Sequence, residues 1–157
     1  MTEQVPATAP AAPSRAAAPA TVQPATPKTM PTFLAALTRT ELFLVAGGAL
    51  ILLTDLIFIP LSGYGVSSVQ WAASAILVMA VLFKSRMPAA LAANYKSILI
   101  GLGALISLVA VRWLVGDLVW IGSNPSRIDG EYLLGMIGVY SGSALVAVAT
   151  WQLWKGR

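Results

Sequence analysis

The chain has 157 residues, of which 57% are hydrophobic and 10% are charged, and its formal net charge is +4. A soluble domain has about a quarter of its residues charged, so this composition, with its long apolar blocks, excludes a water-soluble globule. The chain contains no Cys and no His, which excludes disulfides, thiolate nucleophiles, Cys/His zinc sites and His-ligated haem. We therefore expect an integral membrane protein without a cofactor or a metal.

The first segment, residues 1–31, is rich in Ala and holds seven of the chain's ten prolines. Proline donates no backbone hydrogen bond, and too few large apolar groups are present to offset the entropy of ordering. No uninterrupted apolar run precedes Phe33, as a secretory signal requires, and only Arg15 and Lys28 could supply the charge of a transit peptide. We predict a retained, disordered cytoplasmic tail, followed by a transmembrane domain over residues 32–157.

Four apolar segments follow the tail, at about residues 42–61, 68–83, 97–115 and 132–154. About 20 residues of helix cross a hydrocarbon core of ~30 Å, so the first, third and fourth segments are long enough alone and the second is shorter. Lipid offers the backbone no hydrogen-bond partner, and the alternating pattern of a barrel is missing. The predicted fold is an all-α integral membrane protein with four transmembrane helices.

Helix-start signals stand before each apolar segment. Acidic residues before the last segment also complement the positive end of a helix dipole, which favours capping over catalysis for them. The signals are Thr38-x-x-Glu41, Ser67-x-x-Gln70, Asn94, and the looser Ser126-x-x-Asp129 with Glu131.

The basic residues are distributed unevenly between the two predicted sides of the membrane. With four spans, the tail, the loop 84–96 and the C-terminus share one side, which holds eight basic residues, whereas the opposite side holds only Arg127. The positive-inside rule therefore predicts that both termini are cytoplasmic. The excess of basic residues is explained by this membrane topology, and it does not indicate nucleic-acid binding. The Ala/Pro-rich composition favours a GC-rich bacterial genome, and hence the inner membrane. The eight residues are Arg15, Lys28, Arg39, Lys84, Arg86, Lys96, Lys155 and Arg157.

Two short matches favour an internal duplication into two αα-hairpins. The letters GALI occur at 48–51 and at 103–106, and residues 71–75 correspond to residues 140–144. Parallel repeats of this kind occur in transporters. Membrane helices also draw on few residue types, so matches of four residues arise by chance. Both interpretations stay open.

Two ionisable residues fall inside the predicted spans, Asp55 in the first and Arg112 in the third. Both spans run outward, and helical rise places the two residues roughly 20 and 22 Å from the inner boundary. An unpaired charge at this depth costs several kcal/mol. We expect an Asp55–Arg112 charge pair; snorkelling of each side chain to the outer interface and a transport role are the alternatives.

Several glycines mark faces on which helices could pack closely. Gly48 shares the stripe of Asp55, and Gly101 shares that of Arg112, by helical spacing. Gly138 and Gly142 form a small-xxx-small pair, extended by Gly135. Whether these faces meet helices of the same chain or of another copy is left open by spacing.

The sequence leaves three functional classes. The favoured class is a non-catalytic accessory or structural subunit, with other membrane subunits or copies of itself as partners. The second is a small transporter or channel that uses Asp55 and Arg112 within the membrane. A membrane enzyme ranks third, because without His or Cys its catalysis would depend on scattered carboxylates.

Overall fold

The computed structural model describes residues 36–62, 65–124, 126 and 128–156. The predicted tail over residues 1–31 lies outside this part of the chain. Within it every regular element is a helix. The elements are α1 (Arg39–Ser62), α2 (Ser68–Leu82), a 3-10 turn (Lys84–Arg86), α3 (Ala89–Ala93), α4 (Tyr95–Ser123) and α5 (Gly130–Trp154).

Three of these helices, α1, α4 and α5, are long and apolar enough to cross a membrane. The 15 residues of α2 reach only about 22 Å at about 1.5 Å per residue, so α2 by itself is shorter than the hydrocarbon core. The all-helical prediction is confirmed, and three of its four spans have the required length.

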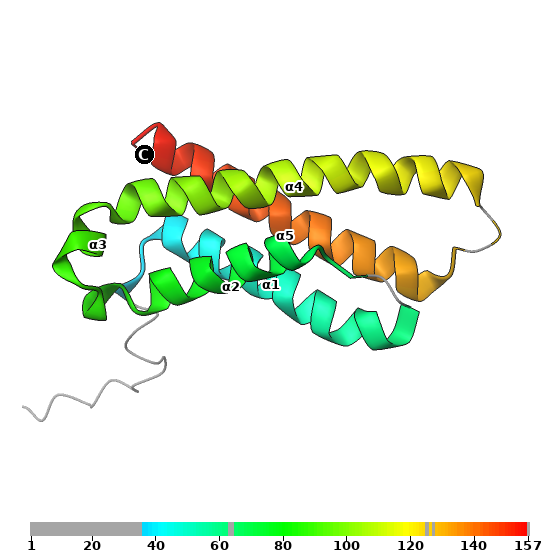
Figure 1. The fold of residues 1–157 in the computed structure, drawn as a ribbon, viewed down its shortest axis with the longest axis horizontal. Helices are drawn as coiled ribbons and strands as arrows, with labels where there is room; N and C mark the ends of the chain where they lie inside the picture. The colour runs from blue at the N-terminus through cyan, green and yellow to red at the C-terminus, as the bar shows by residue number, and fades with distance from the viewer. Residues whose placement is uncertain (1–35, 63–64, 125, 127, 157) are drawn as a thin grey trace, which may run out of the picture.

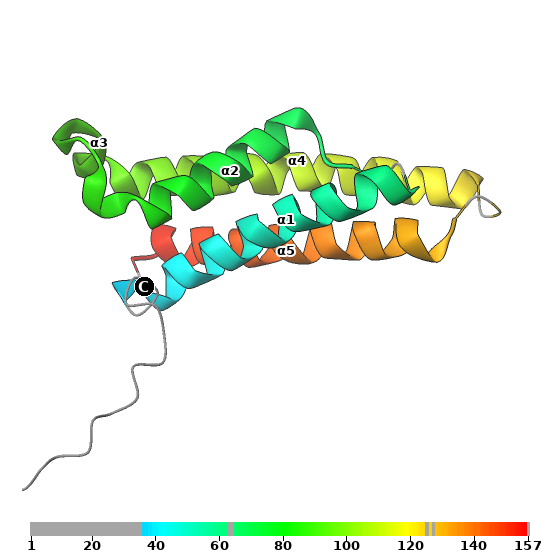
Figure 2. The same cartoon turned by 90° about the horizontal axis from the view of Figure 1, so that it is seen from below.

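The four main helices form an elongated bundle (Figures 1 and 2). Around it, α1 packs against α5 and α2, and α4 also packs against α5 and α2. The start of α1, the end of α5 and the short α3 lie at the same end of the bundle (Figures 1 and 2). We call this the basic end, because the chain places Arg39, Lys84, Arg86, Lys96 and Lys155 there. The opposite end is called the far end.

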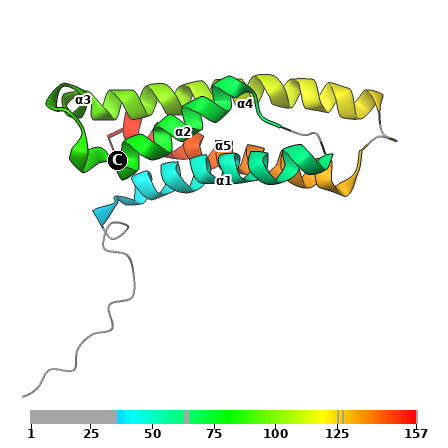
Figure 3. The ribbon, with the colours of Figure 1, turned by 60° about the horizontal axis from the view of Figure 1, so that its bottom comes forward.

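The residues just before α2 lie beside the bundle, not at its far end. Residues 65–67 are not helical, and they run along the bundle to the start of α2 (Figures 1 and 3). Backbone without helical hydrogen bonds is tolerated at membrane depth only where protein satisfies it. Asp55 of α1 does so here: its Oδ1 accepts a hydrogen bond from the backbone N–H of Val66 at 2.7 Å.

The predicted start signals have different outcomes. Thr38 and Glu41 form a reciprocal capping box, in which the Thr38 N–H donates to Glu41 Oε2 at 2.9 Å and the Glu41 N–H donates to Thr38 Oγ1 at 3.2 Å. Ser67 caps α2 by accepting from the Gln70 N–H at 3.2 Å. Both predictions are confirmed.

The other two signals are corrected. The N-cap of α5 is Asp129 itself, which accepts from the Tyr132 N–H at 2.7 Å, and Ser126 precedes it. Asn94 stands at the start of α4 without a side-chain cap, because its Nδ2 donates back to the Ala90 carbonyl at 3.2 Å.

Helix α4 is longer than predicted. It continues to Ser123, whereas the predicted span ended at residue 115. The predicted span ended just before a glycine and a charged residue, Gly116 and Asp117. The Asp117 carboxylate, however, accepts a hydrogen bond from a tyrosine hydroxyl of α5, and Asp117 is only 8% exposed. The next proline, which cannot continue a helix, is Pro125. Asp117 thus belongs to the bundle and not to a loop.

The interior is a continuous apolar core to which every main helix contributes. Leu44 and Ile51 come from α1, and the partners from α5 include Val146. The other fully buried large apolar side chains of the described residues are Leu77 and Val81 of α2, with Leu99 and Ile106 of α4.

Candidate functional site

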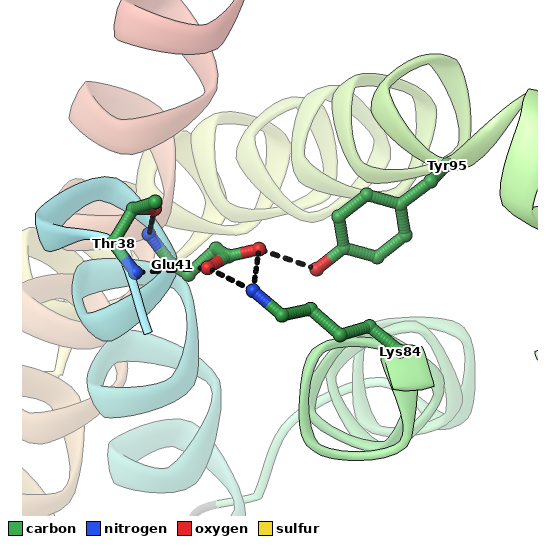
Figure 4. Close-up of polar contacts among 4 residues, drawn as sticks. All are labelled: Thr38, Glu41, Lys84 and Tyr95. Carbon is green, nitrogen blue, oxygen red and sulfur yellow. Dashed lines mark hydrogen bonds and ion pairs between the residues drawn. The ribbon is translucent and has the colours of Figure 1, made fainter. Parts of the chain in front are cut away.

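A buried carboxylate binds three elements together at the basic end. Glu41, which is 5% exposed, accepts hydrogen bonds from Lys84 Nζ at 3.0 Å on Oε1 and at 2.8 Å on Oε2. The Tyr95 hydroxyl donates to Oε1 at 2.9 Å, and the Thr38 N–H completes the set (Figure 4). We call these four residues the Glu41 cluster.

The Glu41 cluster joins the start of α1 to the 3-10 turn after α2 and to the first residue of α4. Both carboxylate oxygens are occupied by donors, so Glu41 has no free position for a substrate proton. Buried charges in proteins are normally paired and hydrogen-bonded in this way. The arrangement is that of a structural clasp. The sequence signal for it was incomplete, because the capping box marked Glu41 but nothing local linked it to Lys84 or Tyr95.

Asp55 lies deeper in the bundle and is 7% exposed. Its partner is the backbone amide of Val66, which belongs to the non-helical segment before α2. The carboxylate therefore holds the returning segment against α1. This use of Asp55 was not predicted, because it depends on where α2 begins.

Arg112 is exposed on α4, and it does not meet Asp55. The structure does not bring the predicted charge pair together: α1 packs mainly against α5 and α2, and its hydrogen bond to α4 is made by Glu41 and Tyr95 at the basic end. Their similar depth was not sufficient, because pairing also requires that the two faces point toward one another.

A third buried carboxylate, Asp117, joins α4 to α5. The Tyr140 hydroxyl donates to its Oδ2 at 2.5 Å, and the Tyr132 hydroxyl lies 3.5 Å from its Oδ1. The Tyr132 ring also contacts Trp120, with ring centroids 5.1 Å apart. Sequence reasoning placed Asp117 on the outer side and missed this contact. A possible signal was the pair of tyrosines on one face of α5, eight residues apart.

Of the glycines predicted to mark close helix packing, some contact a neighbouring helix and one does not. A Cβ at Gly142 would lie 2.7 Å from the Gly47 carbonyl oxygen, and one at Gly48 would lie 2.8 Å from Val78 Cγ2. A Cβ at Gly138 would overlap Thr54 of α1. Gly135 is buried on α5. Gly101 differs: it is exposed, and nothing lies within 4 Å of its added Cβ, so it packs against none of the described helices.

Polar groups also cross the centre of the bundle. Gln70 of α2 donates to Ser143 Oγ of α5 at 3.1 Å, and both side chains are buried. Thr40 donates to Gln152 at 3.3 Å near the basic end. The part of the chain that the structure describes contains no group of three or more acidic residues able to hold a metal. The polar network thus consists of contacts between helices.

Comparisons of the chain with protein-family models, with curated proteins and with solved structures find no match.

Proposed function

We propose that this protein is a non-catalytic subunit of a membrane assembly, with the long helices crossing the bilayer and both termini on the cytoplasmic side. The fourth crossing is made jointly by α2 and the extended segment before it. Two features support the orientation: α1 begins and α5 ends at the same end of the bundle, and that end is the basic one (Figure 1).

The observation that carries the proposal is the exposure of the second half of α4. Every residue from Val111 to Trp120 except Asp117 is exposed. α2 begins partway along the bundle, so α4 has only α5 beside it in this region (Figure 1). In a membrane, helices associate through packing and polar contacts rather than through hydrophobic burial. A long helix with one neighbour thus offers a lateral surface to another membrane helix.

Arg112 gives this surface a chemical preference. A guanidinium on the exposed face of a membrane helix favours a partner that supplies a carboxylate. Within the spanning helices, the carboxylates Glu41, Asp55 and Asp117 are buried, and the exposed Glu131 lies in the first turn of α5, at the far end of the bundle. Among its described residues, a second copy of the same chain therefore offers an exposed helical carboxylate only at the far end, away from the level of Arg112, which favours a different subunit over a homo-oligomer.

A small transporter or channel is the second candidate. It is favoured by Asp55 beside a non-helical backbone segment, since transporters place ion sites at interrupted helices. Against it stands the separation of Asp55 from Arg112. Uptake or conductance in proteoliposomes that is lost in Asp55→Asn, with the fold retained, would move the assignment to this class.

The assembly can be tested with single cysteines, because the chain has none of its own. Val115→Cys on α4 should crosslink to another polypeptide in native membranes. Ile76→Cys, which is similarly exposed on α2, is the matched control and should not. Arg112→Gln should weaken co-purification of the same polypeptide in mild detergent. Equal crosslinking at both positions, or none at Val115, would refute lateral assembly through α4.

The orientation has a separate test. Ser85→Cys lies in the 3-10 turn at the basic end, and Ser126→Cys lies in the α4–α5 connection. In intact cells an impermeant maleimide should label the second and spare the first. The reverse pattern would invert the proposed topology.

A further inference from the structure

A groove runs between α4 and α5 in the half of the bundle nearer the basic end. It has a volume of about 420 Å³. Ala104 and Ser107 line one side, and Ala147, Thr150, Trp151 and Trp154 line the other. A smaller hollow of about 190 Å³ shares Ser107 and Ala147 and lengthens the groove toward Leu114 and Tyr140.

The groove walls present almost no polar group to a ligand. Its two hydroxyls are turned to their own helices, since Ser107 donates to the Gly103 carbonyl at 2.7 Å and Thr150 donates to the Val146 carbonyl at 2.7 Å. The other side chains that line the larger volume are aliphatic or indole. An occupant with hydrocarbon in the groove therefore loses no hydrogen bond on entering it.

The mouth of the groove at the basic end carries positive charge. Lys155 Nζ lies 4.5 Å from the centre of the Trp151 ring, which is part of the wall. Lys96 precedes Ile100, another lining residue, by one helical turn and so lies on the same stripe of α4. Both lysines are exposed, and neither has a carboxylate partner in the described chain. Hydrocarbon walls thus continue into a cationic mouth.

We propose that this groove binds one anionic phospholipid, with an acyl chain between α4 and α5 and its phosphate between Lys96 and Lys155. Basic pockets between membrane helices bind anionic headgroups. A second helix fits the groove less well, because close helix packing needs small residues along the whole contact. Trp151 and Trp154, which are 52% and 65% exposed, would hold its backbone away.

The test uses the purified full chain in neutral detergent with equal amounts of phosphatidylglycerol and phosphatidylcholine, and native mass spectrometry counts the retained lipid. The parent chain should retain phosphatidylglycerol in preference. Lys96→Gln and Lys155→Gln should each lower the apparent affinity for phosphatidylglycerol by roughly fivefold, and leave that for phosphatidylcholine unchanged, because each lysine near a membrane surface contributes about 1 kcal/mol to anionic binding. The matched control Arg86→Gln removes an exposed cation of the same end that lies in the 3-10 turn, and should have no effect.

Two further experiments distinguish the contribution of the acyl chain to binding from that of the phosphate group. Ala104→Leu keeps both lysines and fills the groove from an exposed position, so it should lower retention of both lipids. Inorganic phosphate at the lipid's concentration should not displace phosphatidylglycerol. Displacement by phosphate alone would overturn the acyl-chain assignment.

Tryptophan fluorescence measures lipid binding to the groove without any substitution in the groove itself. In a chain with Trp71, Trp113 and Trp120 replaced by Phe, acyl-chain spin-labelled phosphatidylglycerol should quench the two remaining tryptophans more strongly than the labelled phosphatidylcholine. Equal quenching, equal retention of the two lipids by the parent chain, or a stoichiometric polypeptide crosslinked to Ala104→Cys would each overturn the proposal.

Discussion

Helix α5 packs against two long helices, and the two interfaces are built differently. Against α1, glycines meet on both sides: a Cβ added at Gly47 would lie 2.6 Å from the Gly142 carbonyl oxygen, and the reverse distance, from Gly142 to Gly47, is 2.7 Å. Against α4, the close contact of Thr150 with Gly103 lies in the stretch whose outer side forms the groove, and the helices meet again through the Asp117–Tyr140 hydrogen bond.

The difference shows what decides helix association when lipid is the solvent. Lipid tails are as apolar as a leucine side chain, so burying apolar surface between helices gains little, and close van der Waals contact has to supply the stability. α1 and α5 achieve that contact through matched small residues. α4 and α5 achieve it at isolated points, which leaves the surfaces that we assign to a lipid and a partner subunit.

The largest expected effect is at the closest backbone approach. Gly142→Leu places its Cβ against the backbone of α1, which cannot move aside as a flexible side chain could. We expect a loss of about 3 kcal/mol in the free energy of unfolding in detergent. Ala144→Leu, two positions along and exposed on the groove side of α5, is the control and should change stability little. Similar losses in both would mean that the two interfaces do not differ as described.

The α4–α5 interface should instead be most sensitive at its hydrogen bond. Tyr140→Phe removes the hydroxyl that donates to Asp117 at 2.5 Å and should cost about 2 kcal/mol, the typical contribution of a hydrogen bond to a charged group. Tyr132→Phe, whose hydroxyl lies 3.5 Å from the same carboxylate, should cost clearly less. Unfolding in denaturing detergent measures both. A larger loss for Tyr132→Phe would contradict the geometry.

Two glycines of α4, two residues apart, give a finer comparison of buried and exposed positions. Gly103→Ala adds a methyl group that overlaps Thr150 and should cost about 1 kcal/mol, whereas Gly101→Ala meets nothing and should stabilise by roughly 0.5–1 kcal/mol through helix propensity. Thermal unfolding in detergent distinguishes the two signs. A destabilised Gly101→Ala chain in native membranes but not in detergent would place a partner helix on that face.

The smallest expected effect is the coupling free energy between Asp55 and Arg112, which should be near zero. Because α1 and α4 each pack mainly on α5 and α2, and Asp55 and Arg112 form no ion pair, the double-mutant cycle of Asp55→Leu and Arg112→Leu should be additive within about 0.5 kcal/mol. Asp55→Leu alone should be destabilising, since it leaves the Val66 amide without its acceptor, and Asp55→Asn should recover part of that loss. A coupling above about 1 kcal/mol would restore the charge pair.

Much of the local structure could be predicted from the amino-acid sequence alone. Apolar segments of sufficient length must be helical in lipid, which located α1, α4 and α5 to within a few residues at their starts. The caps at Thr38 and Ser67 are interactions within three residues, so local spacing determined them. The end of α4 was missed because an acidic residue indicates a loop unless its partner on another helix is known.

What only the tertiary structure decided is which faces meet. Counting residues along a helix yields an expected depth, and it predicted similar levels for Asp55 and Arg112. It yields no information on rotation about the bundle axis, which follows from the packing of all the helices together. Asp55 consequently binds the Val66 amide and Arg112 faces outward. For the same reason Gly142 lies in a backbone contact while Gly101 is exposed, although the sequence predicted close helix packing at both.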